Sequence, residues 1–481
     1  MSFENAYKIH FLNSCKMKKI LATLVAATIC ITAFCQDITG TWNGVLKVQA
    51  MQLRLVFNIS KTDNCYSATM DSPDQGAKGI PVTTVSFENA KLQLKIDNAG
   101  ILYEGLFEKD SIVGTFKQGG LVVPMNLSRK IAEKQKVFRP QEPLKPYAYY
   151  EEEVTFENRQ AGITLAGTLT LPKKEGRFPV VVLISGSGPQ NRDEELFGHK
   201  PFLVLADYLT KNGIAVLRYD DRGTASSKGD FNTATTYDLS TDAEAAVEYL
   251  KTRKEINKKQ IGLIGHSEGG MIAPMLASRS KDIAYIVMLA GPGVPIEELL
   301  HKQQELIGKA SGMSDENIQK TGAINKGIYE LIKQSNDPEK LKTDLTAYLQ
   351  KVMKEDTISK RPEGMSDEDI IRQQVSQIAN PWMSYFVKYD PAVVLRKVKC
   401  PVLAINGEKD LQVSPKENLE AIRIALSEGK NKKSTIKSIP GLNHVFQTCE
   451  TGSPMEYGKI EETFSPVAMA EVLNWIKKQV K

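Results

Sequence analysis

Cysteine is scarce in this sequence, and its distribution excludes a fold built on disulfides. The 481 residues contain six cysteines, of which three lie within the first 35 residues. The other three, Cys65, Cys400 and Cys449, are an odd number at wide separations, whereas disulfide scaffolds have even, closely spaced sets. A chain of this length can bury a large hydrophobic core instead, and it exceeds the size of one ordinary domain.

The sequence also lacks a strong charge excess and a long apolar run. Its formal net charge is +5, and residues 1–35 carry four lysines and one glutamate, so their removal leaves +2. We therefore expect no nucleic acid or other polyanion as a partner. The apolar run 20–34 is shorter than the ~20 residues that cross a membrane as a helix, so we expect no stable membrane span.

The first 35 residues are typical of a cleaved secretory signal peptide. Lys16-Met17-Lys18-Lys19 precede the apolar run, and polar Gln36-Asp37 follow it, which is the order of regions in such leaders. Met17 is a second possible start, and cleavage after Cys35 is expected. The mature protein is therefore predicted to be periplasmic or secreted.

Three regions follow the leader. Residues 37–130 alternate apolar and polar positions in short segments, which is typical of a small antiparallel sandwich or barrel. Prolines at 140, 143 and 146 mark a linker over 131–150. Over 151–481, apolar segments alternate with helical ones, which indicates a mostly parallel sheet with helices on both faces. The expected strands of this sheet are 153–156, 164–171, 179–184, 214–219, 260–264, 284–289, 401–406 and 435–439.

A helical cap is expected between about 295 and 390, where only helical periodicity remains. Two similar segments, 312–316 and 364–368, each read Gly-Met-Ser-Asp-Glu and place serine and acidic residues where helix starts favour them. Trp382, Tyr385 and Phe386 follow in an aromatic segment. They either line an acyl pocket of the substrate site or only seal the cap onto the sheet.

The most informative motif lies at 261–270, which reads Ile-Gly-Leu-Ile-Gly-His-Ser-Glu-Gly-Gly. An apolar strand leads directly into Gly-x-Ser-x-Gly, and a helical segment follows, as in a nucleophile elbow. Gly265 and Gly269 are needed because a side chain at either position would collide with the neighbouring strand and helix. Ser267 is therefore predicted to be a nucleophile rather than a passive serine in a surface turn.

A serine nucleophile needs a base, and the base needs an orienting carboxylate. Only five histidines are present. His444 follows the last expected strand, where a loop can carry it over the strand ends, whereas the side chain of His266, next to the serine, should diverge from it. Asp410 follows the strand 401–406 and a glycine turn, with Glu408 as a rival acid in the same turn. We predict Ser267, Asp410 and His444 as a catalytic triad.

Two backbone amides must also stabilise the oxyanion of an acyl-transfer intermediate. The amide of Glu268, directly after the nucleophile, is one candidate. The other is the amide of Ser187 in the glycine-rich turn 185–189, which follows the third expected strand. The alternative is that this turn serves only to connect strand and helix.

The chain resembles the α/β-hydrolase superfamily, and more narrowly bacterial carboxylesterases with a small N-terminal β module, which are related to prolyl-oligopeptidase-like and serine-aminopeptidase-like hydrolases. The segments that carry the resemblance are 183–193, 218–223, the elbow, 406–410 and 443–444. The resemblance implies an α/β-hydrolase fold with a helical cap insertion and a small N-terminal all-β domain.

The resemblance has further implications beside the site. The chain departs from its relatives at Ser185 and Ala225, where histidine and glycine are common. Asp221 and Arg222 are expected to form an ion-paired structural turn. Cys400 and the loop that carries Cys449 are expected at opposite ends of the sheet, so no bridge between Cys400 and Cys449 is expected.

The predicted reaction is hydrolysis of small to medium carboxylic esters through an acyl-enzyme, without a metal or organic cofactor. Activity is expected to rise with pH through a group near ~7. A peptidase of the prolyl-oligopeptidase or aminopeptidase type could use the same triad, although the front module of ~90 residues is too short for a propeller. A non-catalytic envelope-binding protein is disfavoured because all three triad positions are filled.

Overall fold

The computed structural model describes residues 37–480 apart from 49–50, 63–64, 74–76, 119–120, 132–138 and 356–365. The predicted leader, residues 1–35, lies outside the described residues, as does part of the predicted linker. Within the described ranges, no helix combines the length and the apolar character that crossing a membrane requires.

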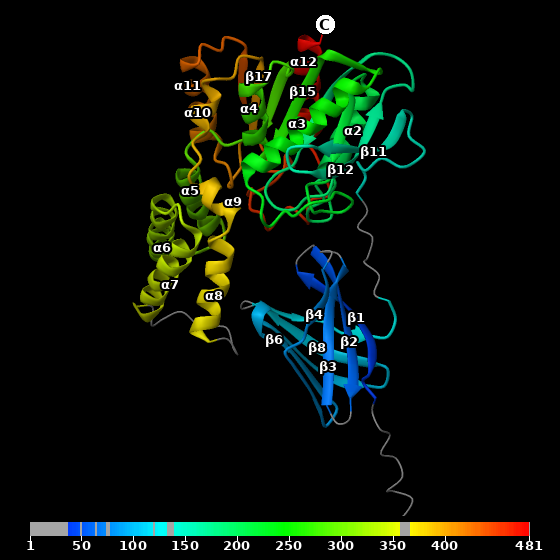
Figure 1. Cartoon of the computed structure of the whole chain (residues 1–481), viewed down its shortest axis with the longest axis vertical. Helices are drawn as coiled ribbons and strands as arrows, with labels where there is room; N and C mark the ends of the chain where they lie inside the picture. The colour runs from blue at the N-terminus through cyan, green and yellow to red at the C-terminus, as the bar shows by residue number, and fades with distance from the viewer. Residues whose placement is uncertain are drawn as a thin grey trace, which may run out of the picture.

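The N-terminal strands form one curved antiparallel sheet, a half-barrel (Figure 1). The strand order is β4-β3-β2-β1-β10-β8-β7-β6-β5, with β9 paired to β8. Alternating positions place Trp42, Phe57 and Tyr103 in its buried core, so the sequence pattern corresponds to the barrel alternative rather than to a two-sheet sandwich. The strands are β1 (Gly40–Val48), β2 (Met51–Thr62), β3 (Cys65–Ser72), β4 (Ala77–Pro81), β5 (Thr84–Glu88), β6 (Lys91–Ile96), β7 (Ile101–Glu108), β8 (Ser111–Gln118), β9 (Leu121–Pro124) and β10 (Leu127–Ser128).

A second sheet of eight strands has the order β11-β12-β14-β13-β15-β16-β17-β18. The pairs β11–β12 and β12–β14 are antiparallel, and all other pairs are parallel. Each of the eight expected strands is present, and the strand before the elbow is longer than the predicted 260–264. The strands are β11 (Tyr150–Asn158), β12 (Ile163–Leu171), β13 (Phe178–Ile184), β14 (Ala215–Tyr219), β15 (Ile256–His266), β16 (Tyr285–Leu289), β17 (Val402–Gly407) and β18 (Ser434–Ile439).

Helices cover both faces of this sheet, which explains why its strands are apolar without strict alternation. Helices α2 (Pro201–Lys211) and α12 (Pro466–Gln479) pack on one face. Helices α3 (Thr236–Thr252), α4 (Gly269–Arg279) and α11 (Pro415–Glu428) pack on the other. We call the sheet and these helices the hydrolase unit.

The chain between β16 and β17 leaves the sheet and forms the cap. Its helices are α5 (Ile296–Ala310), α6 (Asp315–Gln334), α7 (Pro338–Glu355), α8 (Asp367–Ile378) and α9 (Pro381–Val387), followed by the short α10 (Pro391–Leu395). Ser314 and Ser366 cap α6 and α8 through their side chains, as the repeated Gly-Met-Ser-Asp-Glu segments predict. The half-barrel meets the cap where the short helix η2 (Asp97–Ala99) contacts α8.

The segment that joins the half-barrel to the hydrolase unit is anchored by Arg139. Its guanidinium donates hydrogen bonds to four backbone carbonyls, those of Phe197, Gly198, Gly458 and Ile460, at 2.6–3.2 Å. The arginine is only 6% exposed. Arg139 therefore packs against the hydrolase unit from within the segment 131–150, which the sequence analysis assigns to a linker.

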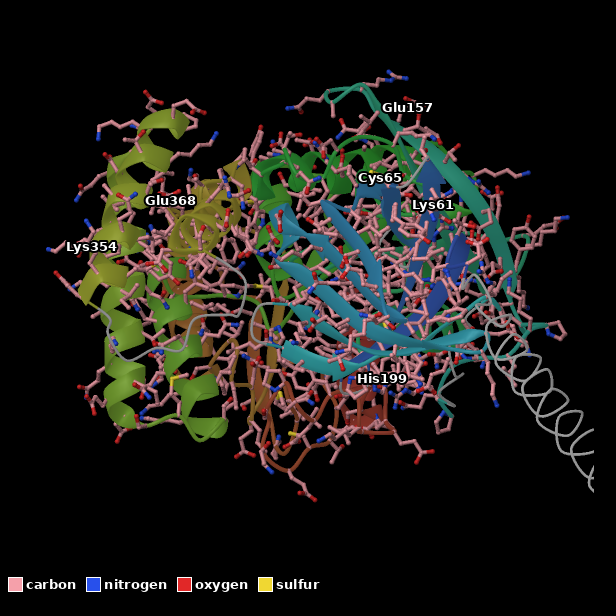
Figure 2. All side chains as sticks on the ribbon, turned by 90° about the horizontal axis from the view of Figure 1, so that it is seen from below. Lys61, Cys65, Glu157, His199, Lys354 and Glu368 are labelled. Carbon is pink, nitrogen blue, oxygen red and sulfur yellow. The ribbon has the colours of Figure 1, made fainter. Side chains whose placement is uncertain are left out.

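Figure 2 shows the cap and the half-barrel from a second direction. Lys354 and Glu368 lie on the cap helices at one side of the view, whereas Lys61 and Cys65 lie on the half-barrel strands. The three cysteines among the described residues are free thiols, in agreement with the expectation that Cys400 and Cys449 are not bridged.

Candidate active site

The elbow lies between β15 and α4 and holds Ser267 in a left-handed backbone conformation, with φ +52°. Non-glycine residues rarely adopt this region, and it persists where the surroundings enforce it. A Cβ added to Gly265 would lie 1.9 Å from the carbonyl oxygen of Gly269, and one added to Gly269 would lie 2.1 Å from that of Ile184. Both glycines are thus required by close backbone approach, as the motif predicts. Ser267 is partly exposed, while its neighbours on both sides are buried.

Asp410 and His444 lie in the loops that follow β17 and β18, and they are in direct contact. His444 Nδ1 donates to Asp410 Oδ2 at 2.8 Å, and both residues are buried. The other carboxylate oxygen of Asp410 accepts from the amides of Gln412 and Val413 at 2.7 and 2.9 Å. These bonds fix the carboxylate, which in turn fixes the ring orientation, and His444 Nε2 has no hydrogen-bond partner among the residues that the structure describes.

The rival acid occupies a different environment. Glu408 is exposed, and its carboxylate accepts from the amide of Gly441 at 3.0 Å. Among the described residues the ion pair of His444 is with Asp410, so the structure brings Asp410 and not Glu408 to the histidine.

Ser267 lies at the same edge of the sheet as this pair, because β15, β17 and β18 are parallel and all end there. Its hydroxyl does not form a hydrogen bond to His444 within the described part of the chain. Hydrogen bonds of this kind are often long in ligand-free enzymes and shorten when substrate binds.

The glycine-rich turn after β13 borders the serine. A Cβ on Gly186 would lie 3.3 Å from the Cβ of Ser267, and Gly188 has φ +92°. Neither the Ser187 amide nor the Glu268 amide donates to an acceptor on the described residues. Both predicted oxyanion donors are therefore available to a ligand, whereas the amide of Gly186 is already used by Glu194 at 2.7 Å.

The turn of Asp221 and Arg222 is ion-paired, as expected, but the two residues do not pair with each other. Arg222 instead binds Asp242 on α3, with its Nε 2.7 Å from one carboxylate oxygen and its Nη2 2.9 Å from the other. Asp221 accepts from the hydroxyl of Ser185 at 2.8 Å and from the amide of Gln190 at 2.9 Å. The side chains of Asp221 and Arg222 thus point in different directions. Ser185, where relatives often carry histidine, has Asp221 as its hydrogen-bond partner.

The side chain of Glu268 connects the elbow to the cap. Its Oε1 accepts from Thr236 Oγ1 at 2.6 Å and from Trp382 Nε1 on α9 at 2.8 Å. Burial raises the pKa of the Glu268 carboxyl, and the hydrogen bonds from Thr236, Trp382 and Ser187 oppose this rise. The cap is therefore attached directly to the residue that follows the nucleophile.

The predicted pocket aromatics pack in two stacked pairs. Trp382 stacks on Phe386 with ring centroids 4.6 Å apart, and Tyr385 stacks on Tyr389 at 6.1 Å. Phe386 is buried in a cluster with Met271 of α4. Trp382 and Phe386 thus join the cap to the elbow helix, a position that fits both roles weighed in the sequence analysis.

Sequence reasoning missed a buried pair beside the site, His266 and Glu194. His266 Nδ1 lies 2.8 Å from Glu194 Oε1, and Nε2 lies 3.1 Å from the carbonyl oxygen of His444. Burial opposes a charge on His266, but the Glu194 carboxylate and the hydrogen bonds outweigh it and raise the pKa of His266. The side chain of His266 does diverge from Ser267, as expected, but it turns towards the loop of His444.

The strand order and the serine on a strained strand-to-helix turn define an α/β-hydrolase. Comparison with known proteins agrees. A family profile described as X-Pro dipeptidyl-peptidase (S15 family) matches residues 161–432. The chain is 31% identical over 335 residues to Esterase EstD of Thermotoga maritima, which covers 68% of this chain and 69% of that protein. An uncharacterized Pseudomonas aeruginosa protein is 32% identical over 137 residues, which covers 28% of this chain and 35% of that one.

Solved structures align at lower identity. Est1E of Butyrivibrio proteoclasticus, determined with ferulic acid bound, has 18% identity and a TM-score of 0.40, with 68% of this chain and 99% of that chain covered. The chain belongs to the α/β-hydrolase superfamily, in its S15 and esterase-like branch.

Proposed function

We propose that this protein hydrolyses small to medium carboxylic esters through an acyl-enzyme on Ser267. The Ser267 hydroxyl attacks the ester carbonyl while His444 Nε2 accepts its proton, and His444 then returns this proton to the departing alcohol. Water attacks the acyl-enzyme by the same route, and the acid leaves. Asp410 holds the tautomer of His444 and stabilises the imidazolium that forms.

The amides of Ser187 and Glu268 are proposed as the donors to the oxyanion. They lie on the two backbone turns that border the nucleophile, and both are free of protein acceptors among the described residues. A donor of this kind contributes on the order of 10²–10³ in rate. The oxyanion would thus be held by backbone groups whose positions are fixed by β13 and α4.

The observation that carries this proposal is the convergence of a strained serine and a buried histidine–aspartate pair at one edge of the sheet. The φ of +52° at Ser267 and the 2.8 Å bond between His444 and Asp410 are both features that a passive surface turn would not need. We further propose that Trp382, Tyr385 and Phe386 border the acyl side of the substrate, since α9 packs against the elbow.

The test is hydrolysis of nitrophenyl esters of increasing acyl length by the wild type and by Ser267→Ala. We expect turnover by the wild type, loss of turnover in the variant, and labelling of the wild type alone by a fluorophosphonate probe. Wild-type turnover retained by Ser267→Ala would refute the assignment. A wild type that neither turns over esters nor reacts with the probe would instead favour the non-catalytic, envelope-binding alternative.

A peptidase is the second candidate, because the matching family profile describes X-Pro dipeptidyl-peptidases. The same serine, histidine and aspartate would serve amide hydrolysis. The relative with 31% identity is described as an esterase, which supports the ester reaction. Comparing kcat/KM for nitrophenyl acetate with that for aminoacyl and Xaa-Pro amides separates the two, and we expect the ester to be preferred.

A further inference from the structure

The pair of Glu194 and His266 contacts three loops of the candidate site. Glu194 Oε1 accepts from the amide of Gly186, in the glycine-rich turn 185–189 that carries the Ser187 amide. We call this turn the oxyanion turn. His266 belongs to the elbow, directly before Ser267, and its Nε2 faces the backbone carbonyl of His444 at 3.1 Å. One buried side-chain pair therefore joins the oxyanion turn, the nucleophile elbow and the histidine loop.

The partners of His266 determine how many protons its ring carries. The His444 carbonyl oxygen can only accept, so Nε2 must carry a proton. A carboxylate can also only accept, so Nδ1, 2.8 Å from Glu194 Oε1, must carry a second proton if Glu194 is ionised. A doubly protonated ring beside an ionised carboxylate satisfies every contact, including the Gly186 amide that donates to the same oxygen.

Both residues of this pair are buried, so a charge on either one must be compensated by the other. His266 is 6% exposed and Glu194 2%, so neither charge is shared with water, and each depends on the other. Glu194 also holds a left-handed backbone conformation, with φ +51°, which the surrounding contacts must enforce.

The other titratable groups that face His266 come from the two loops of the candidate triad. Asp410 raises the pKa of His266 through its charge, and the His444 ring lies 4.9 Å away, centroid to centroid. Because the pair of Glu194 and His266 is neutral as a whole, it places no net charge beside the His444 ring that would oppose its protonation during catalysis.

We propose that Glu194 and His266 are positioning residues, and that their buried carboxylate–imidazolium pair holds the oxyanion turn, the elbow and the His444 loop in the arrangement needed for acyl transfer. The inference rests on the proposed function of Ser267 and His444. It assigns the histidine of the Gly-His-Ser-Glu-Gly motif a task other than proton transfer to the substrate.

The pair also sets an alkaline limit to activity. When His266 loses a proton at high pH, one of its two nitrogens can no longer donate, and the bond to Glu194 or to His444 is lost. Since its two acceptor contacts require both ring protons and the Glu194 carboxylate helps to raise the pKa of His266 against the effect of burial, we expect kcat to fall on the alkaline side. Glu194→Gln removes the stabilising charge, so this fall should move to lower pH by about one unit or more.

The direct test counts the protons on His266 in the wild type by NMR of protein with ¹⁵N-labelled histidine, assigned with His266→Gln. We expect both ring nitrogens of His266 to be protonated at neutral pH. His199 provides an internal reference, because burial and then the charge of Arg139 lower its pKa to about 4. A His266 ring with a single N–H at pH 7 would overturn the proposal, and this readout holds whether or not the protein turns over esters.

Kinetics of Glu194→Gln and His266→Gln test the positioning role. Both substitutions keep a hydrogen-bonding side chain of similar reach, and we expect kcat to fall on the order of 10- to 100-fold, with KM changed by less than about threefold. The matched control is His199→Gln, another buried histidine in the hydrolase unit, which should leave the alkaline limb in place. Unchanged kcat and an unchanged alkaline limb in both folded variants would refute the inference.

Failure of this inference and failure of the proposed function give different results. If the wild type hydrolyses esters and Ser267→Ala does not, but both pair variants behave as wild type, only the positioning role is lost. If Ser267→Ala retains wild-type turnover, the proposed function itself is wrong. Should a pair variant fail to fold, the proton count on wild-type His266 still decides the matter.

Discussion

Replacing Arg139 by alanine should destabilise the hydrolase unit, although the residue lies in a segment that the sequence presents as a linker. The guanidinium donates to four carbonyl oxygens on two loops that are more than 250 residues apart in the chain, at 197–198 and 458–460. Arg139→Ala would leave these carbonyls to whatever water can enter the space.

The size of the effect follows from the number and burial of these bonds. A hydrogen bond to a charged group contributes about 1.5–3 kcal/mol, and a buried acceptor left without a partner costs about 1–3 kcal/mol. Water replaces some of the lost bonds and the four are not independent, so we expect the free energy of unfolding to fall by about 2–4 kcal/mol. For a unit of this size that corresponds to a melting temperature lower by about 3–8 °C.

Differential scanning calorimetry of Arg139→Ala and of a matched control, Arg423→Ala, measures the effect. Arg423 pairs with Glu420 on the surface of α11, with 58% of its side chain exposed, so its removal should change stability by less than about 0.5 kcal/mol. We expect the transition of the hydrolase unit to shift only in Arg139→Ala. Equal melting temperatures in the two variants would show that the four bonds contribute nothing net to stability, and the anchoring role of Arg139 would fail.

Three further predictions concern the site and its surroundings. Asp410→Asn should lower kcat by about 10³–10⁴ because the His444 tautomer is no longer fixed, whereas a loss below tenfold in steady-state assays would contradict its role. Trp382→Phe keeps the ring stack but removes the donor to Glu268, so the free energy of unfolding should fall by about 1–3 kcal/mol, measured as a lower melting temperature. An unchanged melting temperature would mean that the bond is not formed. Burial lowers the pKa of His199 to about 4. Between pH ~6.5 and about 4, His199 is therefore protonated in the unfolded chain but neutral in the folded chain. Wild type should therefore lose stability relative to His199→Gln as pH falls from about 6.5 to 4, and parallel melting curves over this range would contradict that.

The eight strands of the hydrolase unit could be predicted because a strand that is buried on both faces is a continuous apolar run. Such a run is visible in the local sequence without knowledge of the neighbouring strands. Asp410 and His444 could be located for a related reason. Parallel strands end at one edge of the sheet, so polar residues just after two such strands meet there. The contact between them is observed, and their catalytic roles remain predictions that the variants above test.

Side-chain partners across elements could not be predicted in the same way. The choice of Asp242 over Asp221 by Arg222 depends on the orientation of α3 against the turn, which no local pattern encodes. The role of Arg139 depends on two loops that only the folded chain brings together. Glu194 and His266 are separated by 72 residues, and a sequence shows a histidine beside a nucleophile without showing which way the ring turns.

The cap leaves the sheet after β16 and returns at β17, and these two strands are direct neighbours. The cap is thus an insertion between two adjacent strands. Replacing it with the corresponding segment of a relative would leave the order of the strands unchanged. The junction that such a chimera must preserve is the indole of Trp382 on the carboxyl of Glu268. Under the proposed function, such an exchange is expected to transfer acyl preference between homologues while Ser267, Asp410 and His444 stay in place.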